Sequence, residues 1–125
     1  MNPLLASMSS FVSKNQHYIG KSILVAWTLV AEDGSVLGKT QFHGSIVSVS
    51  ESDGIVIERA NGKGRFALPP DLESLEKANP GHYHLKNSEE VVVDPDYIST
   101  WTIEIHDLAS VGDLLEHGFQ SKVDS

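Results

Sequence analysis

Three short polar clusters divide residues 18–68 into apolar runs, and this alternation constrains the fold more than any other feature of the chain. Each cluster combines acidic or amide residues with glycine: Glu32-Asp33-Gly34-Ser35, Glu51-Ser52-Asp53-Gly54 and Asn61-Gly62-Lys63-Gly64. Gly, Asn and Asp accept the backbone angles of tight turns, so each cluster predicts a hairpin. The apolar runs therefore predict an antiparallel meander with strands over 18–31, 36–50, 55–57 and 65–68.

The second of these runs changes its hydrophobic phase. Phe42 and Ile46 occupy even positions, whereas Val47 and Val49 occupy odd positions. Because strand side chains alternate between faces, a phase change beside Gly44 predicts a bulge or a sharp bend. Small barrels need such a bend to close, so we expect a strongly curved sheet that closes into a barrel.

Shorter elements are predicted beyond the meander. Pro69-Pro70 ends the fourth strand, and Asp71 is a suitable N-cap for a short helix that runs to residue 78. Trp27 and Trp101 each lie on the more apolar face of a predicted strand, so both are expected in the core. Further strands are expected over 83–85, 91–93 and 97–106, followed by a C-terminal helix over 107–119 and a frayed tail over 120–125.

Helical signals occur near both ends of the chain. Asn2-Pro3 favours a helix start, and five apolar residues then follow at helical spacing: Leu4, Leu5, Met8, Phe11 and Val12. The predicted helix over residues 1–15 either packs on its own barrel or mediates self-association with a second subunit. Near the other end, Ser110 with Asp113 resembles a capping box, and Gly118 resembles a helix stop.

The pattern from Ser22 to Glu58 resembles the first half of an SH3-like or Sm-like barrel. The shared features are a strand, an acidic Gly turn, a bent strand with a central Gly, a second Asp-Gly turn and a short β-branched strand. The resemblance implies an architecture and carries over no functional residue, because Sm-like proteins also have a basic residue and a Gly entering a late strand, which the chain after Phe66 lacks. We therefore expect one mostly β domain over 1–125, with a small SH3-like or Sm-like barrel over 18–106 and three peripheral helices.

The net charge of −8 is concentrated in the second half of the chain. Residues 1–65 carry six Lys or Arg against five Asp or Glu, whereas residues 66–125 carry three against twelve. An acidic half repels the phosphates of nucleic acids and anionic lipids, and it suits a basic protein partner or cations. No apolar run reaches the roughly 20 residues of a membrane span. A signal peptide begins with a basic region, but no Lys or Arg precedes Lys14 here. We expect a cytoplasmic protein that binds neither membrane nor nucleic acid.

The densest acidic cluster lies on both sides of the strand predicted over 91–93, between two tyrosines. These residues are predicted to bind a protein partner: Tyr83, Glu89, Glu90, Asp94, Asp96 and Tyr97. Aromatic and acidic side chains together suit a basic partner surface. The alternative is that Asp94 and Asp96 bracket the Pro95 turn and stay solvated, because Asp favours turns.

His82 and His84 are weak candidates for a metal site. Residues two apart on a strand share a face, so both imidazoles could meet one ion, with a third ligand from His43, His106, Asp94 or Asp96. The alternative is a pair of exposed strand histidines. We predict no metal and no cofactor.

Sequence motifs for nucleophilic catalysis, phosphate binding and dinucleotide binding are missing from the chain. The leading hypothesis is a non-catalytic protein-binding module, such as an adaptor, inhibitor or immunity-type protein, that presents an acidic and aromatic face and can self-associate as a homo-oligomer. One alternative is a small metal-dependent or small-molecule enzyme that uses His82, His84, Asp94 and Asp96. The other is Sm-like nucleic-acid binding, which the net charge opposes.

Overall fold

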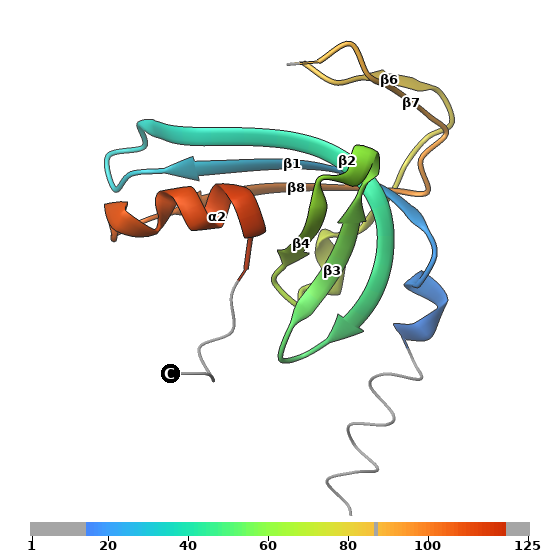
Figure 1. Cartoon of the computed structure of the whole chain (residues 1–125), viewed down its shortest axis with the longest axis horizontal. Coiled ribbons are helices and arrows are strands. Elements are labelled where there is room, and N and C mark those ends of the chain that lie inside the picture. The colour runs from blue at the N-terminus through green and yellow to red at the C-terminus, as the bar shows by residue number, and fades with distance from the viewer. Residues whose placement is uncertain (1–14, 87, 120–125) are drawn as a thin grey trace, which may run out of the picture.

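A computed structural model describes residues 15–86 and 88–119 (Figure 1). The predicted N-terminal helix, with its five self-association candidates, and the predicted frayed tail lie outside the described residues, apart from residue 15.

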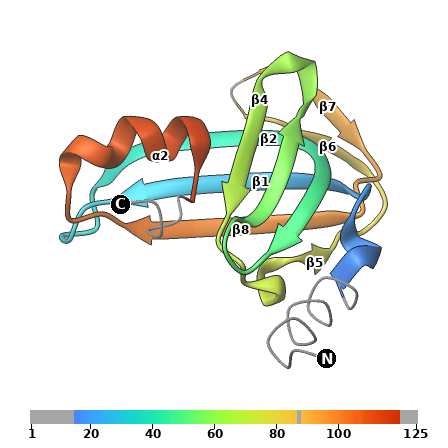
Figure 2. The same cartoon turned by 60° about the horizontal axis from the view of Figure 1, so that its bottom comes forward.

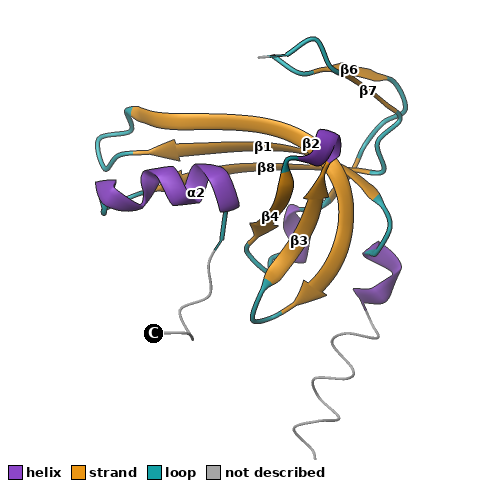
Figure 3. Cartoon of the chain, viewed as in Figure 1, coloured by secondary structure: helices purple, strands orange, loops and turns teal. Residues whose placement is uncertain are grey.

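The described chain is mostly β, as predicted (Figure 3). The strands are β1 (Ser22–Val30), β2 (Val36–Ser50), β3 (Gly54–Arg59), β4 (Gly64–Leu68), β5 (Glu76–Lys77), β6 (His82–His84), β7 (Val91–Val93) and β8 (Tyr97–Glu104). The helical elements are the α-helix α2 (Val111–His117) and four 3₁₀ turns, η1 (Gln16–Tyr18), η2 (Ala60–Gly62), η3 (Leu72–Ser74) and η4 (Leu108–Ser110). The turn clusters of the sequence join β1 to β4 as the meander predicted.

The main sheet is open, with the strand order β4-β3-β2-β1-β8-β5. Neighbouring strands are antiparallel except for β1 and β8, which run parallel. The predicted closure into a barrel is therefore not found, because β8 extends the sheet on the far side of β1 and does not return to β4. The strands β6 and β7 form a separate hairpin.

The curvature of the sheet resides in β2, as the phase change predicted. Its first part pairs with β1 up to Ser45, and its last part pairs with β3 from Gly44 onward. The register shifts between Ile46 and Ser48, so Val47 is the bulged residue. Figures 1 and 2 show the consequence, which is that β3 and β4 turn across β1, β2 and β8.

The main core fills the space between the two halves of this bent sheet. Trp27 is 1% exposed and meets Phe66 edge to face, with ring centroids 5.1 Å apart, and Phe66 also packs on Phe42. Trp101 is half-buried beside Trp27, and its Nε1 donates to Ser99 Oγ at 2.8 Å. Core burial is thus confirmed for Trp27 and partial for Trp101.

The two later helices differ from their predictions. Asp71 caps as expected, accepting from the Glu73 N–H, but the helix predicted to residue 78 is one 3₁₀ turn followed by β5. At the C-terminal helix, Asp107 and not Ser110 supplies the side-chain cap, by accepting from the Ala109 N–H before η4. The helix predicted over 107–119 is thus divided into the 3₁₀ turn η4 and the seven-residue helix α2.

Gly118 ends α2 and brings the chain onto the edge of β4. Its φ of 78° lies in the region that favours glycine, and a Cβ there would overlap the Ala67 carbonyl oxygen. The next residue, Phe119, donates its N–H to that oxygen at 2.7 Å. Within the part of the chain that the structure describes, no helix is long and apolar enough to cross a bilayer.

Candidate functional site

The β6–β7 hairpin projects from one end of the main sheet (Figure 1). Its inner face rests on that sheet through a second small core, in which Leu85 and Val92 are buried with Leu24 of β1. Tyr83 packs against the same cluster, and its hydroxyl donates to the Asn79 carbonyl oxygen at 2.7 Å. The hairpin is therefore held by a compact apolar contact, which leaves its other face to solvent.

That outer face carries two imidazoles and two valines. His82 lies opposite Val93, and His84 lies opposite Val91, so the four side chains share one side of the ribbon. All four are exposed, Val91 by 43% and Val93 by 55%. Exposed apolar side chains that lie next to one another are unfavourable in water, and such patches often mark a surface that a partner covers. We call these four residues the hairpin face.

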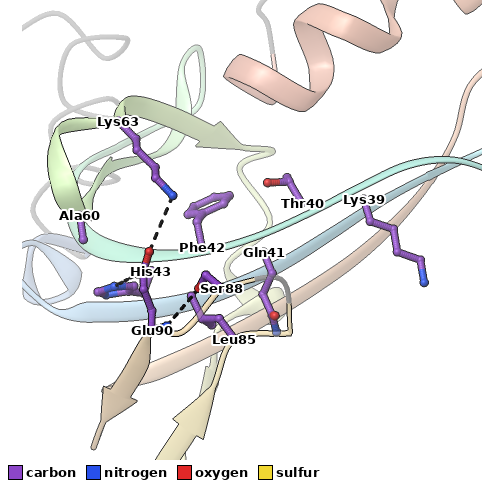
Figure 4. Close-up of a pocket in the computed structure, with 10 residues that line it drawn as sticks. All are labelled: Lys39, Thr40, Gln41, Phe42, His43, Ala60, Lys63, Leu85, Ser88 and Glu90. Carbon is purple, nitrogen blue, oxygen red and sulfur yellow. Dashed lines mark hydrogen bonds and ion pairs between the residues drawn. The ribbon is translucent and has the colours of Figure 1, made fainter.

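The acidic residues that the sequence grouped together separate in the structure. Glu90 turns to the strand β2, where its Oε2 lies 2.8 Å from His43 Nε2 and its Oε1 lies 3.7 Å from Lys63 Nζ (Figure 4). Glu89, in contrast, is exposed. One acidic residue of the pair thus fastens the hairpin, and the other remains on its surface.

Asp94 and Asp96 stabilise the turn around Pro95. Asp94 has a φ of 49° and exchanges two hydrogen bonds with Gly81, one from its own N–H and one to its Oδ1, both 2.8 Å long. Asp96 accepts from the Ser22 N–H at 2.9 Å and from the Ser22 hydroxyl at 3.1 Å. These bonds hold the pKa of the Asp96 carboxyl below its usual range. Both carboxylates remain exposed, so they also contribute negative charge to the surface.

A hollow of about 460 Å³ lies beside this turn. Lys21 and Lys77 line it together with Asp94 and Asp96, so its charges are balanced. Tyr97 forms another part of the wall and packs on Tyr18, with ring centroids 5.4 Å apart. Tyr97 therefore lies away from the hairpin face. The hollow has two lysines and two aspartates, so its charge favours neither an anionic nor a cationic ligand.

The described residues offer the histidine pair no third metal ligand. His82 and His84 share a face, as predicted, but His43 is joined to Glu90, and His106 lies 2.5 Å from Glu32. Among residues 15–86 and 88–119, no three His, Asp or Glu side chains are grouped so that they could hold a metal ion. The pair is therefore better described as part of the hairpin face.

A second hollow, of about 230 Å³, lies at the edge of β2 (Figure 4). Five consecutive residues of that strand line it, from Lys39 to His43, and Ala60 and Lys63 close one side while Leu85, Ser88 and Glu90 close the other. The Lys86 N–H donates to Gln41 Oε1 at 2.8 Å, which fixes the tip of the hairpin beside the same strand. We call this cavity the β2-edge hollow.

The partner-binding residues predicted from the sequence lie in the same segment as the hairpin face, but they do not include its apolar residues. From the sequence alone, Val91 and Val93 predict only a strand. The run Val91-Val92-Val93 contains the missed signal, because a strand can bury only alternate residues on one face. Comparison of the chain with protein-family models, with curated proteins and with solved structures finds no match in any of the three.

Proposed function

We propose that this protein is a non-catalytic protein-binding module and that the hairpin face is its contact surface. The observation that carries the proposal is the pair of exposed valines, Val91 and Val93, side by side on a ribbon that projects from the sheet. Interfaces combine an apolar centre with a polar rim, and the flanking His82 and His84 supply polar side chains to that rim.

The charge around the hairpin face defines the chemistry of the partner. Glu89 and Asp94 are exposed at the two ends of the strand that carries the valines. Residues 66–125 hold twelve acidic residues against three basic ones, so the surroundings are negative as well. The partner we propose has an apolar centre and a rim of Lys or Arg, because complementary charge speeds association and excludes wrong partners. The sequence pattern of residues 22–58 resembles that of SH3-like barrels, but the sheet is open, so the resemblance adds no contact residue to the proposal.

The test is site-specific photo-crosslinking in cells. A benzophenone amino acid replaces Val93 in one variant and Thr102, an exposed residue on the outer face of β8, in the control variant. We expect discrete adducts from position 93 alone, and we expect their loss in a Val91→Ser background. Adducts should also weaken when lysates are cross-linked near 0.5 M salt, where the screening length falls to roughly 4 Å.

Two results would overturn the proposal. One is the absence of adducts from position 93, and the other is the same adducts from both positions. An adduct of twice the chain mass identifies a second copy as the partner and supports self-association in place of a different protein. Circular dichroism of the serine variant checks folding, since exposed substitutions of this kind change stability by only about 0.5 kcal/mol.

A further inference from the structure

A second candidate surface is the unpaired edge of β2. The strand has fifteen residues, but β3 pairs only with the part from Gly44 onward. From Val36 to His43, no strand of the described chain pairs with β2 on the side opposite β1. Figure 1 shows this part of β2 as the outermost strand of the long half of the sheet.

The hydrogen bonds of Ile46 show which backbone groups of β2 point toward this edge. Its N–H donates to the Lys21 carbonyl at 2.9 Å, and its carbonyl accepts from the Gly20 N–H at 2.7 Å, so its backbone groups face β1. Peptide groups alternate in direction along a strand, and the β1–β2 register is regular from Ser45 back to Gly38. The N–H and C=O groups of Lys39, Gln41 and His43 therefore face the free edge. Such a row is a template for another strand.

The charge beside the edge is positive, unlike that of the whole chain. The β2-edge hollow is lined by Lys39, Lys63 and His43, and among the described residues Glu90 is the only acidic one in its lining. A smaller hollow of about 140 Å³ shares Lys39 with it and adds Lys86. In a chain of net charge −8, this concentration of lysines favours a negatively charged occupant.

Glu90 shows which chemical group this edge can hold. Its carboxylate lies between His43 Nε2 and Lys63 Nζ, and its side chain is only 26% exposed. The chain itself thus supplies one carboxylate to the end of the hollow near His43, whereas no carboxylate lies within ion-pair distance of Lys39 among the described residues. A second acidic group can therefore be bound farther along the strand.

We propose that the edge of β2 from Leu37 to His43 binds an extended acidic segment of a partner protein as an added strand. Backbone hydrogen bonds to Lys39, Gln41 and His43 supply the pairing, and the Lys39 and Lys63 ammonium groups select acidic side chains. Edge lysines normally protect a sheet from pairing with neutral or basic strands, so the same residues that prevent aggregation admit an acidic strand. The partner and surface differ from those of the hairpin face.

The test is an NMR titration of the full-length ¹⁵N-labelled protein. The probe is a capped eight-residue peptide of alternating Val and Glu, and the control is the same peptide with Lys in place of Glu. We expect amide shift changes in residues 37–43 with the acidic peptide alone. Two N-methylated forms of the acidic peptide, methylated at odd or at even residues, should differ, because only alternate N–H groups of an added strand face β2.

Variants then separate charge from pairing. Lys39→Glu with Lys63→Glu should weaken binding at least tenfold, whereas Lys77→Glu on β5, at the opposite edge of the sheet, should leave it unchanged. The Val91→Ser variant should also bind normally, which distinguishes this surface from the hairpin face. The proposal is overturned by a Kd weaker than about 1 mM for the acidic peptide, by equal binding of the lysine peptide, or by equal binding of the two methylated forms. Thermal melts of each variant confirm that it is folded.

Discussion

Replacement of Gly44 by alanine is the most direct test of the bend in β2. A Cβ at this position would overlap the Glu58 carbonyl oxygen and lie 2.9 Å from its carbonyl carbon and 3.0 Å from Arg59 Cα. All three atoms belong to the backbone of β3, so no side-chain rotation can relieve the contact. Gly44 does not have a positive φ, and the penalty is therefore steric.

The expected cost has two parts. Overpacking a rigid site costs about 1–3 kcal/mol, and displacing β3 weakens its pairing with Gly44 and Ser45 at about 1 kcal/mol per hydrogen bond lost. Together they amount to about 3 kcal/mol, a large part of the 5–15 kcal/mol that stabilises an ordinary domain. For a chain of this size, 1 kcal/mol shifts the Tm by about 4 °C, so we expect a fall of roughly 12 °C.

Thermal and urea unfolding followed by circular dichroism provide the measurement, and Gly112→Ala is the matched control. Gly112 lies in α2, has no atom within 4 Å of a built Cβ and lacks a positive φ. Alanine there should stabilise the protein by about 0.5 kcal/mol, because glycine is a poor helix former. A Gly44→Ala variant as stable as the parent would refute the close approach of the β3 backbone to Gly44, and a destabilised Gly112→Ala variant would refute the assignment of α2.

Three further predictions concern other parts of the fold. Asp96→Asn should cost about 1 kcal/mol, at the low end for a charged hydrogen bond because the group is exposed. Adding Ser22→Ala should cost about 1 kcal/mol more, because the Ser22 hydroxyl also accepts from the backbone N–H of residue 96 at 2.8 Å, and a double-mutant cycle measures the coupling of the two side chains. Since the pKa of Asp96 is lowered, its stabilisation is present above the unfolded carboxyl pKa near 4 and is lost as the pH falls below that value, so urea midpoints of the Asn variant should decline less on acidification. Leu115→Ala should lower stability by about 2 kcal/mol, because this half-buried side chain packs over Gly38, and an unchanged melting temperature would contradict the docking of α2. Excess Zn²⁺ should leave the Tm unchanged, because His82 and His84 have no third ligand among the described residues, whereas a rise would restore the metal hypothesis.

Local sequence signals predicted the meander well. The turn clusters located all four strands of β1 to β4 to within a few residues at most ends, because Gly and Asp at tight turns act through neighbouring residues alone. The bend near Gly44 was predicted for the same reason, since a change of hydrophobic phase is visible in one strand. The bulge itself lies at Val47, three residues further along.

The open sheet could not be predicted from such signals. Closure depends on which strand meets β8, and the pairing of Ile23 with Tyr97 joins distant parts of the chain. The alternation of residues 97–104 indicates a strand without indicating its neighbour. The short helix expected after Asp71 failed for a related reason, since Glu76 and Lys77 pair with β8 and leave the helix after one turn.

One geometric feature of the hairpin face was predicted from the sequence. The shared face of His82 and His84 follows from strand alternation, and the structure has it. The roles of the acidic residues do not follow from composition, because the partners of Glu90 and Asp96 are His43 and Ser22, which are remote in sequence. The free edge of β2 was hidden as well, since a strand and its unpaired edge have the same sequence pattern.

The parallel pair of β1 and β8 also has a consequence for how the chain folds. The bonds between Ser22 and Asp96 join residues 74 apart in sequence, and closing a loop of that length costs about 4 kcal/mol of chain entropy. The meander can form from local contacts alone, so β8 is expected to dock late. Until β8 docks, the edge of β1 is unpaired and its apolar side chains are less covered. The chain is therefore most prone to aggregation in the period before β8 docks. The Ser22–Asp96 bonds lie at the start of both strands, where they can set the register as the last strand arrives.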